Sequence, residues 1–306
     1  MKITYNISDL VPYVNWVYFF YAWQVKEEAE KQRLRQEAEV LLSKLEGRYH
    51  VYGIFELFDA YGEEDDIIIR GERGEARGER GEARGERLPQ TLRIPCLRQQ
   101  QGTPPYLCLS DFLPPKNISL TSSFIPEQSS PTRSLSPLTS KEPLTPKLGL
   151  FATTVDMGLE TDFDADPYQK MMVQLLADRL AEAAAERMHE QIRKEYWGYA
   201  KDENLSIPDM LVEKFQGIRP AVGYPSLPDT SLNFVLDDIL DMKQIGIRLT
   251  ESGAMKPHAS VSGMMFSHPQ ARYFNLGKIG EDQLQDYARR RGLPVEVMRK
   301  FLASNL

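Results

Sequence analysis

The sequence is most informative between residues 217 and 225, which read Gly217-Ile218-Arg219-Pro220-Ala221-Val222-Gly223-Tyr224-Pro225. Two prolines stiffen this segment and two glycines allow it to turn, so its backbone can approach another molecule closely. The guanidinium of Arg219 suits a carboxylate, because its planar donors match the two carboxylate oxygens. A rigid surface turn with a salt-bridged arginine would explain the same residues. The segment alone leaves both interpretations open.

Motifs on both sides of this segment occur in an order that is known from one protein family. The first is the aromatic run YVNWVYFF at residues 13–20, and the last is DQLQDYAR at residues 282–289. Between them lie CLRQQ at 96–100, LSDFLPPK at 109–116, LADRLAEA at 176–183, YWGYA at 196–200, LTES at 249–252, ASVSG at 259–263 and FSHP at 266–269. In this order, over nearly the whole chain, they resemble the S-adenosylmethionine-binding reactivation domain of cobalamin-dependent methionine synthase.

The resemblance implies an α+β fold, a bent and mainly antiparallel sheet with flanking helices, formed by residues 1–306 as one domain. Two positions depart from the family pattern. Asn15 stands where the family has an acid in its first motif, and residues 228–233 read PDTSLN where the family has P-x-H-T-E-K. Asn15 therefore lacks the negative charge that, by the resemblance, the family's acid offers to the cationic groups of S-adenosylmethionine.

Local sequence patterns place the helices and strands. Residues 26–46 are rich in helix-forming residues and precede Gly47, whereas residues 1–25 indicate an aromatic, turn-rich start. Asp166 and Pro167 begin a long helix to about residue 196, whose apolar stripe is Met172, Leu176, Leu180, Ala184 and Met188. We expect further helices at 232–243, 281–291 (closed by Gly292) and after Pro294, and strands at 49–58, 66–69, 91–97, 106–109, 147–155, 247–249, 259–262 and 273–276.

Two low-complexity segments interrupt the first half of the chain. Residues 70–88 repeat the unit Arg-Gly-Glu-Arg-Gly-Glu-Ala, in which arginine and glutamate nearly cancel and no aromatic residue occurs. This composition favours a flexible, solvated hairpin tip over an RNA-binding tract. Residues 117–146 are rich in serine, threonine and proline and contain Ser-Pro and Thr-Pro pairs. They predict a disordered surface insertion, with phosphorylation as the alternative.

The composition excludes several classes of protein. The net charge of −7 disfavours nucleic-acid binding. The two cysteines, Cys96 and Cys108, form no metal-binding or disulfide framework, and we expect a cytoplasmic protein with no signal peptide and no transmembrane helix. The four histidines form no Asp-x-His-x-x-Gly motif for cobalt, and no Gly-x-Gly-x-x-Gly turn is present. We therefore expect no metal site and no homocysteine methylation by this chain alone.

The resemblance assigns roles to nine residues. It implies that S-adenosylmethionine is bound by Asn15, Glu182, Glu213, Arg219, Ala221, Gly223, Tyr273 and Phe274. Tyr224 would face the cobalt side of the site and carry the catalytic role. Ordinary structural roles compete with each assignment: Glu182 and Glu213 could face water, Tyr224 could anchor the turn, and Tyr273 and Phe274 could belong to the core. Successive side chains of a strand face opposite ways, so only one of this last pair could stack on adenine.

The function implied is the reductive methylation of cob(II)alamin, which reactivates a methionine synthase. Cobalamin would be held by a partner, a corrinoid-binding methionine synthase chain, and a flavodoxin-like protein would donate the electron. S-adenosylmethionine would donate the methyl group. Two alternatives remain open: reactivation of a different corrinoid protein, and a degenerate S-adenosylmethionine-binding protein that lost activity with the change at Asn15.

Overall fold

The computed structural model describes residues 1–71, 91–116 and 147–306. Most of both predicted inserts, residues 72–88 and 117–146, therefore lies outside the described residues. The prediction of one domain over residues 1–306 stays a prediction.

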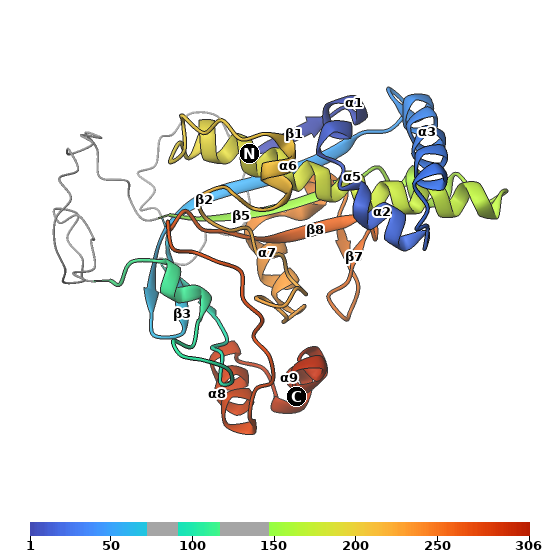
Figure 1. Cartoon of the computed structure of the whole chain (residues 1–306). Coiled ribbons are helices and arrows are strands. Elements are labelled where there is room, and N and C mark those ends of the chain that lie inside the picture. Colours follow the sequence, from blue (N-terminus) through green and yellow to red (C-terminus); the bar gives the residue numbers. More distant parts are fainter. Residues whose placement is uncertain (72–90, 117–146) are drawn as a thin grey trace, which may run out of the picture.

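A six-stranded antiparallel sheet forms the centre of the molecule. Its order is β4 (Thr91–Pro95), β3 (Asp66–Arg70), β2 (Val51–Glu63), β5 (Lys147–Val155) and β8 (Ser260–Met265), with β1 (Lys2–Tyr5) also paired to β2. The long strand β2 pairs with β1 and β5 along its first part and with β3 at its end. Figure 1 shows that β2 continues from the main sheet toward β3, which turns away from β5 and β8. The predicted α+β class with a bent antiparallel sheet is confirmed.

Helices cover both faces of this sheet. Helix α5 (Pro167–Gln191) packs with Phe151 and Val261 on one face, and α7 (Leu232–Leu240) packs with Leu150 and Met264 on the other. Neighbouring residues of β5 thus enter different cores, because side chains alternate along a strand. The predicted stripe of α5 is buried in full, and Asp166 caps the helix by accepting hydrogen bonds from the next backbone N–H groups.

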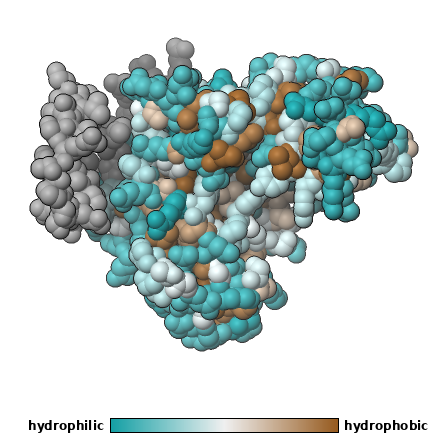
Figure 2. Space-filling view, in the orientation of Figure 1, coloured by the Kyte–Doolittle hydropathy of each residue, from teal (hydrophilic) through white to brown (hydrophobic). Residues whose placement is uncertain are grey.

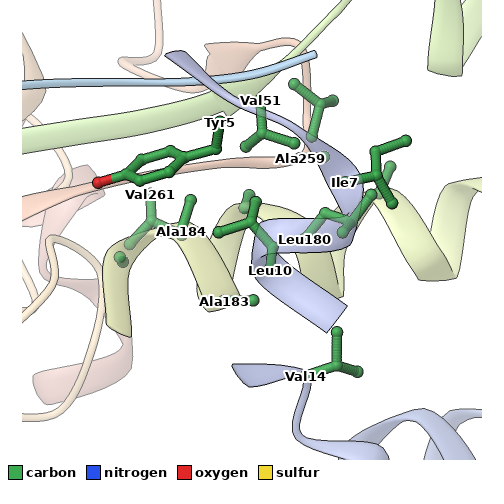
Figure 3. Packing of buried hydrophobic residues seen from close by; sticks show 14 of the residues in the cluster. Tyr5, Ile7, Leu10, Val14, Val51, Leu180, Ala183, Ala184, Ala259 and Val261 are labelled. Atoms are coloured by element: carbon green, nitrogen blue, oxygen red, sulfur yellow. The ribbon is translucent and has the colours of Figure 1, made fainter. Parts of the chain in front are cut away.

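The N-terminal elements lie against α5. They are α1 (Ile7–Leu10), the 3-10 turn η1 (Val11–Tyr13), α2 (Trp16–Ala22) and α3 (Glu28–Leu45). Figure 3 shows Tyr5, Ile7, Leu10 and Val14 facing Leu180, Ala183 and Ala184 of α5. The expected turn-rich start at residues 1–25 instead contains one strand and two short helices, because its apolar side chains find a partner surface on α5 that local sequence does not show.

The last two long helices build a small separate core. Helices α8 (Glu281–Arg291) and α9 (Val295–Phe301) pack around Leu284, Tyr287, Met298 and Leu302. Figure 1 places them beyond β3, near the C-terminus. The Tyr287 hydroxyl donates to Asp229 (2.7 Å), which joins α8 to the turn before α7. The predicted helix at 281–291, closed by Gly292 with positive φ, is confirmed.

The remaining elements are short. They are the 3-10 turns η2 (Leu109–Phe112), η4 (Met242–Ile245) and η5 (Ala303–Asn305), α4 (Gly158–Thr161), the π-helical turn η3 (Ile192–Tyr196), α6 (Ile207–Leu211), and the paired strands β6 (Arg248–Leu249) and β7 (Met255–Lys256).

Two predicted strands are absent from the described chain. At residues 106–109, Cys108 forms only an isolated bridge with Arg98, and a helical turn follows because the Asp111 carboxylate accepts the Cys108 N–H (2.8 Å). At residues 273–276 the backbone bonds to a side chain and a turn rather than to a strand: the Phe274 N–H donates to the Ser226 hydroxyl (3.0 Å).

The segment at 217–222 is attached to β8 by its backbone. Ile218 and Phe266 exchange two hydrogen bonds of 3.0 and 2.9 Å, and the Pro220 carbonyl accepts the Met264 N–H at 3.0 Å. Gly263 permits this contact, because a Cβ there would lie 2.2 Å from the Pro220 oxygen. The segment that carries Arg219 is therefore fixed to the sheet and is not a free surface loop.

We predict that Gly263→Ala lowers the free energy of unfolding by about 1–3 kcal/mol, since the added methyl group overpacks a backbone contact. Urea unfolding measures the effect. Gly280→Ala is the control, because its added Cβ meets mainly the flexible side chain of Asp282 and its φ is −81°. Equal stability of the two variants would contradict the close approach of segment 217–222 to β8.

Candidate functional site

A cavity of about 670 Å³ lies between α5, the N-terminal helices and the segment at 217–226. Its lining residues are Tyr13, Asn15, Tyr18, Arg179, Glu182, Glu186, Leu211, Glu213, Arg219, Pro220, Ala221, Tyr224, Pro225, Ser226, Tyr273, Phe274 and Asn275. Figure 2 shows a largely hydrophilic face with apolar patches near α6 and α2. Exposed Val17, Tyr18 and Tyr21 belong to α2.

Eight of the nine predicted site residues line this cavity. Gly223 does not, although it lies in the same turn. Its φ of +88° is strained for other residues, and its N–H donates to the Leu227 carbonyl at 2.8 Å. Gly223 therefore shapes the turn that presents Ala221 and Tyr224.

Arg219 is a buried cation with an incomplete set of partners. It is 7% exposed, and its Nη2 forms an ion pair with Glu186. Its backbone N–H donates to the Tyr273 hydroxyl at 2.9 Å. The Nε atom is buried and has no hydrogen-bonding partner among the described residues. Burial acts to lower the pKa of Arg219, but nearby Glu186, Tyr273 and Glu182 raise it, so the side chain stays charged.

Glu182 and Tyr224 are hydrogen-bonded across the cavity. The Tyr224 hydroxyl donates to Glu182 at 2.7 Å, and the tyrosine is 53% exposed. Burial of the hydroxyl end, followed by the Glu182 charge, raises the pKa of Tyr224. The hydroxyl is therefore a proton donor at neutral pH. Tyr224 is not a buried anchor of the turn.

Glu213 contributes a third carboxylate. It lies two residues after the end of α6 (Ile207–Leu211) and has a φ of +60°, an uncommon conformation for glutamate. The residue is exposed overall, yet it lines the cavity. Shielding from water and then the charge of Glu186 raise its pKa, while Arg219 lowers it. Glu213 and Glu186 are thus two acids on the same cavity, with Arg219 between them in charge.

Tyr273 and Phe274 have different environments. Tyr273 is half-buried, and burial raises its pKa to about 12. Phe274 is buried in the core below α7, and its carbonyl accepts a hydrogen bond from the Ser226 hydroxyl. Both residues line the cavity, but only Tyr273 carries a polar group on its side chain.

Asn15 has a structural role at the edge of the cavity. It is the N-cap of α2, and its Oδ1 accepts the Val17 N–H at 3.2 Å. Asparagine and aspartate serve equally well at this position. The helix start is therefore preserved, although the negative charge of the family residue is missing.

The lining also includes residues that the sequence interpretation did not assign to the site, among them Tyr13, Tyr18, Arg179 and Glu186. Arg179 lies over the ring of Tyr18, with 5.8 Å from its guanidinium carbon to the ring centre. Glu186 could have been found by its spacing, because it is one helical turn after Glu182 and shares its face.

The chain matches known proteins over most of its length. Residues 6–292 match the model of the vitamin B12-dependent methionine synthase activation domain. The crystal structure of the MetH reactivation domain bound to AdoHcy is similar, with a TM-score of 0.81 and 36% sequence identity. The match covers 100% of this chain and 90% of that chain. The chain belongs to the activation-domain family of vitamin B12-dependent methionine synthase.

The described part of the activation domain lacks two features. In the part of the chain that the structure describes, no helix is long and apolar enough to cross a membrane. Within residues 1–71, 91–116 and 147–306, no group of three or more histidine, cysteine, aspartate or glutamate side chains is arranged to hold a metal ion.

Beneath Arg219 the activation domain buries a histidine. His189 is fully buried on α5, packs edge-to-face on Phe215, and lies 3.5 Å by its Nε2 from the Tyr199 hydroxyl. Burial, then the positive charges of Arg193 and Arg219, hold its pKa well below the ordinary value. His189 is therefore neutral in the folded protein.

This arrangement predicts a loss of stability in mild acid. Below pH 6.5, the unfolded chain binds a proton at His189 and the folded chain does not, so unfolding becomes easier as pH falls. The maximal slope is about 1.4 kcal/mol per pH unit. We expect His189→Gln to flatten the dependence of unfolding free energy on pH between 7 and 5. His268→Gln should have a smaller effect in the same direction, because His268 is only partly shielded. An unchanged slope in His189→Gln would show that His189 is not kept neutral.

Proposed function

We propose that this activation domain binds S-adenosylmethionine in the 670 Å³ cavity and supports the reductive methylation of cob(II)alamin, which reactivates a cobalamin-dependent methionine synthase. The observation that carries the proposal is the buried Arg219 guanidinium facing a cavity that is also lined by carboxylates. This arrangement offers opposite charges to the two ends of an amino acid.

The charges of the cavity are complementary to this ligand. Glu182, Glu186 and Glu213 oppose Arg179 and Arg219, which leaves one excess negative charge on the lining side chains. S-adenosylmethionine carries an ammonium, a sulfonium and a carboxylate, and therefore one excess positive charge. Arg219 lines the cavity and supplies a charged donor for the carboxylate, and Glu182 and Glu213 are acceptors for the cationic groups.

The nucleoside is assigned to the wall formed by residues 273–275. Tyr273 provides an aromatic side chain, and Phe274 lines the cavity next to it. Ala221 has a small side chain that leaves room for the ligand beside Pro220. A related domain, the MetH reactivation domain, has been crystallised with AdoHcy, which supports the same ligand class here.

The chain supplies position, and the partner supplies the reactive centre. One electron reduces cob(II)alamin to the cob(I) state, whose electron pair takes the sulfonium methyl group; the products are methylcobalamin and S-adenosylhomocysteine. We assign the corrinoid to a methionine synthase partner chain and the electron to a flavodoxin-like donor, as the family resemblance implies. Tyr224, half-exposed at the cavity, is the residue we assign to the reacting side of the site.

A degenerate binding protein is the second candidate, and Asn15 is the observation that favours it. The two functions differ in one assay: both bind S-adenosylmethionine, but only the first supports methylation of reduced corrinoid. The same methylation assay, run once with methionine synthase and once with another corrinoid protein as the partner, distinguishes which of the two this domain reactivates.

We expect the wild-type chain to bind S-adenosylmethionine without added metal, and Arg219→Ala to weaken binding by about 1.5–3 kcal/mol, because the carboxylate loses a charged donor. Calorimetry measures both. Arg35→Ala is the matched control, since Arg35 pairs with Glu39 on the surface of α3. No binding by the wild type, or equal binding by Arg219→Ala, would refute the assignment.

Asn15→Asp should tighten S-adenosylmethionine binding by about 0.5–1.5 kcal/mol, because a carboxylate strengthens the hydrogen bond to the ligand ammonium. The cap of α2 should be unaffected, so the melting temperature serves as the control. S-adenosylhomocysteine, which keeps the ammonium and lacks the sulfonium, separates the two charges. If neither affinity changes, Asn15 does not contact the ligand.

A further inference from the structure

Two carboxylates of α5 bind the segment at 217–225. Glu182 accepts the Tyr224 hydroxyl, and Glu186, one turn later on the same face, pairs with Arg219. The proposed function gives Glu182 and Tyr224 a direct role toward ligand. It leaves Glu186 without one, although Glu186 makes the only ion pair of Arg219 among the described residues.

Three contacts, with Tyr273, Phe151 and Glu186, restrict the position of Arg219. Its backbone is held by the Tyr273 hydroxyl, and its guanidinium carbon lies 5.7 Å from the centre of the Phe151 ring. Glu186 takes one nitrogen, Nη2, while Nε keeps no partner in the described part of the chain. The ion pair therefore orients the guanidinium and leaves donors free.

Other acids compete for this cation. Glu213 and Glu182 both line the cavity, and neither makes a hydrogen bond to Arg219 in the described structure. A buried guanidinium without Glu186 would turn toward one of them, since an unpaired buried charge is costly. Its remaining donors would then face a different direction.

We propose that Glu186 is a positioning residue, which fixes the Arg219 guanidinium so that its free donors meet the α-carboxylate of the ligand. This inference rests on the proposed function, and it concerns the amino-acid end of the ligand alone. Loss of Glu186 should therefore weaken ligands that carry the carboxylate and spare those that lack it.

The test measures the dissociation constants of S-adenosylmethionine and decarboxylated S-adenosylmethionine, which keeps the ammonium and sulfonium. Glu186→Ala should raise the constant for the first ligand by about tenfold and change that for the second by less than about twofold. Glu186→Gln, which retains an oxygen acceptor for Nη2, should recover most of the loss. Glu39→Ala, on the surface of α3, controls for the change in net charge.

A double-mutant cycle shows whether Glu186 acts through Arg219. Arg219→Ala with Glu186→Ala should bind S-adenosylmethionine as weakly as Arg219→Ala alone, and this variant has no buried charge left unpaired. Additive losses, equal weakening of both ligands, or unchanged binding by Glu186→Ala would each overturn the positioning role. If the wild type binds neither ligand, the proposed function itself is wrong; if it binds both and only the cycle fails, the error is confined to Glu186.

Discussion

The packing of α5 on the sheet is the constraint on which the site depends. One face of this helix buries Met172, Leu176, Leu180 and Ala184, and the Thr153 hydroxyl of β5 donates to the Ala181 carbonyl at 3.0 Å. Glu182 and Glu186 project from the neighbouring face of the same rigid helix. Since segment 217–222 is bonded to β8 in the same sheet, the acids and Arg219 are held by one framework. Small displacements of α5 would therefore move Glu182 and Glu186 together relative to Arg219.

Burial of Arg219 is an energetic compromise. Removing a guanidinium from water is unfavourable, and an ion pair with Glu186 offsets this only in part. The unpaired Nε, the unpaired Nδ1 of nearby His189 and the unpaired Nη1 of Arg193 add to the unfavourable terms within the described residues. A buried charge such as Arg219 can be retained where binding of a ligand offsets its cost, because a functional site need not be the most stable arrangement. The neutral state of His189 belongs to the same compromise: a second cation at that position would repel Arg219.

The sequence predicted correctly those helices and strands whose caps and apolar patterns are set by neighbouring residues. The Asp166 cap and apolar stripe of α5, the strand at 147–155 and the Gly292 helix end needed no distant partner. The helices within residues 1–25 were not predicted, because their stability comes from contact with α5, which lies far away in the sequence. The site residues came from family resemblance, and the structure brought eight of nine to one cavity. Glu186 was missed for a physical reason: a glutamate on a helix ordinarily faces water, and its pairing with Arg219 is a long-range contact.

The replacement of the family acid by Asn15 is tolerable for reasons visible in the cavity. Asparagine preserves the cap of α2, so the helix that bears Tyr18 keeps its place. Its amide oxygen accepts the Val17 N–H and keeps a second lone pair for the ligand ammonium, but it carries no negative charge. In the proposed complex, Glu182 and Glu213 supply the negative charges for the cationic end of the ligand. Because three carboxylates still outnumber two guanidiniums, the cavity remains attractive to a cation without the acid at position 15. Asn15 in place of an acid should loosen the orientation of the ligand ammonium more than it lowers the attraction of the cavity for a cation. Attraction depends on the summed charge of the cavity, whereas orientation depends on individual hydrogen bonds.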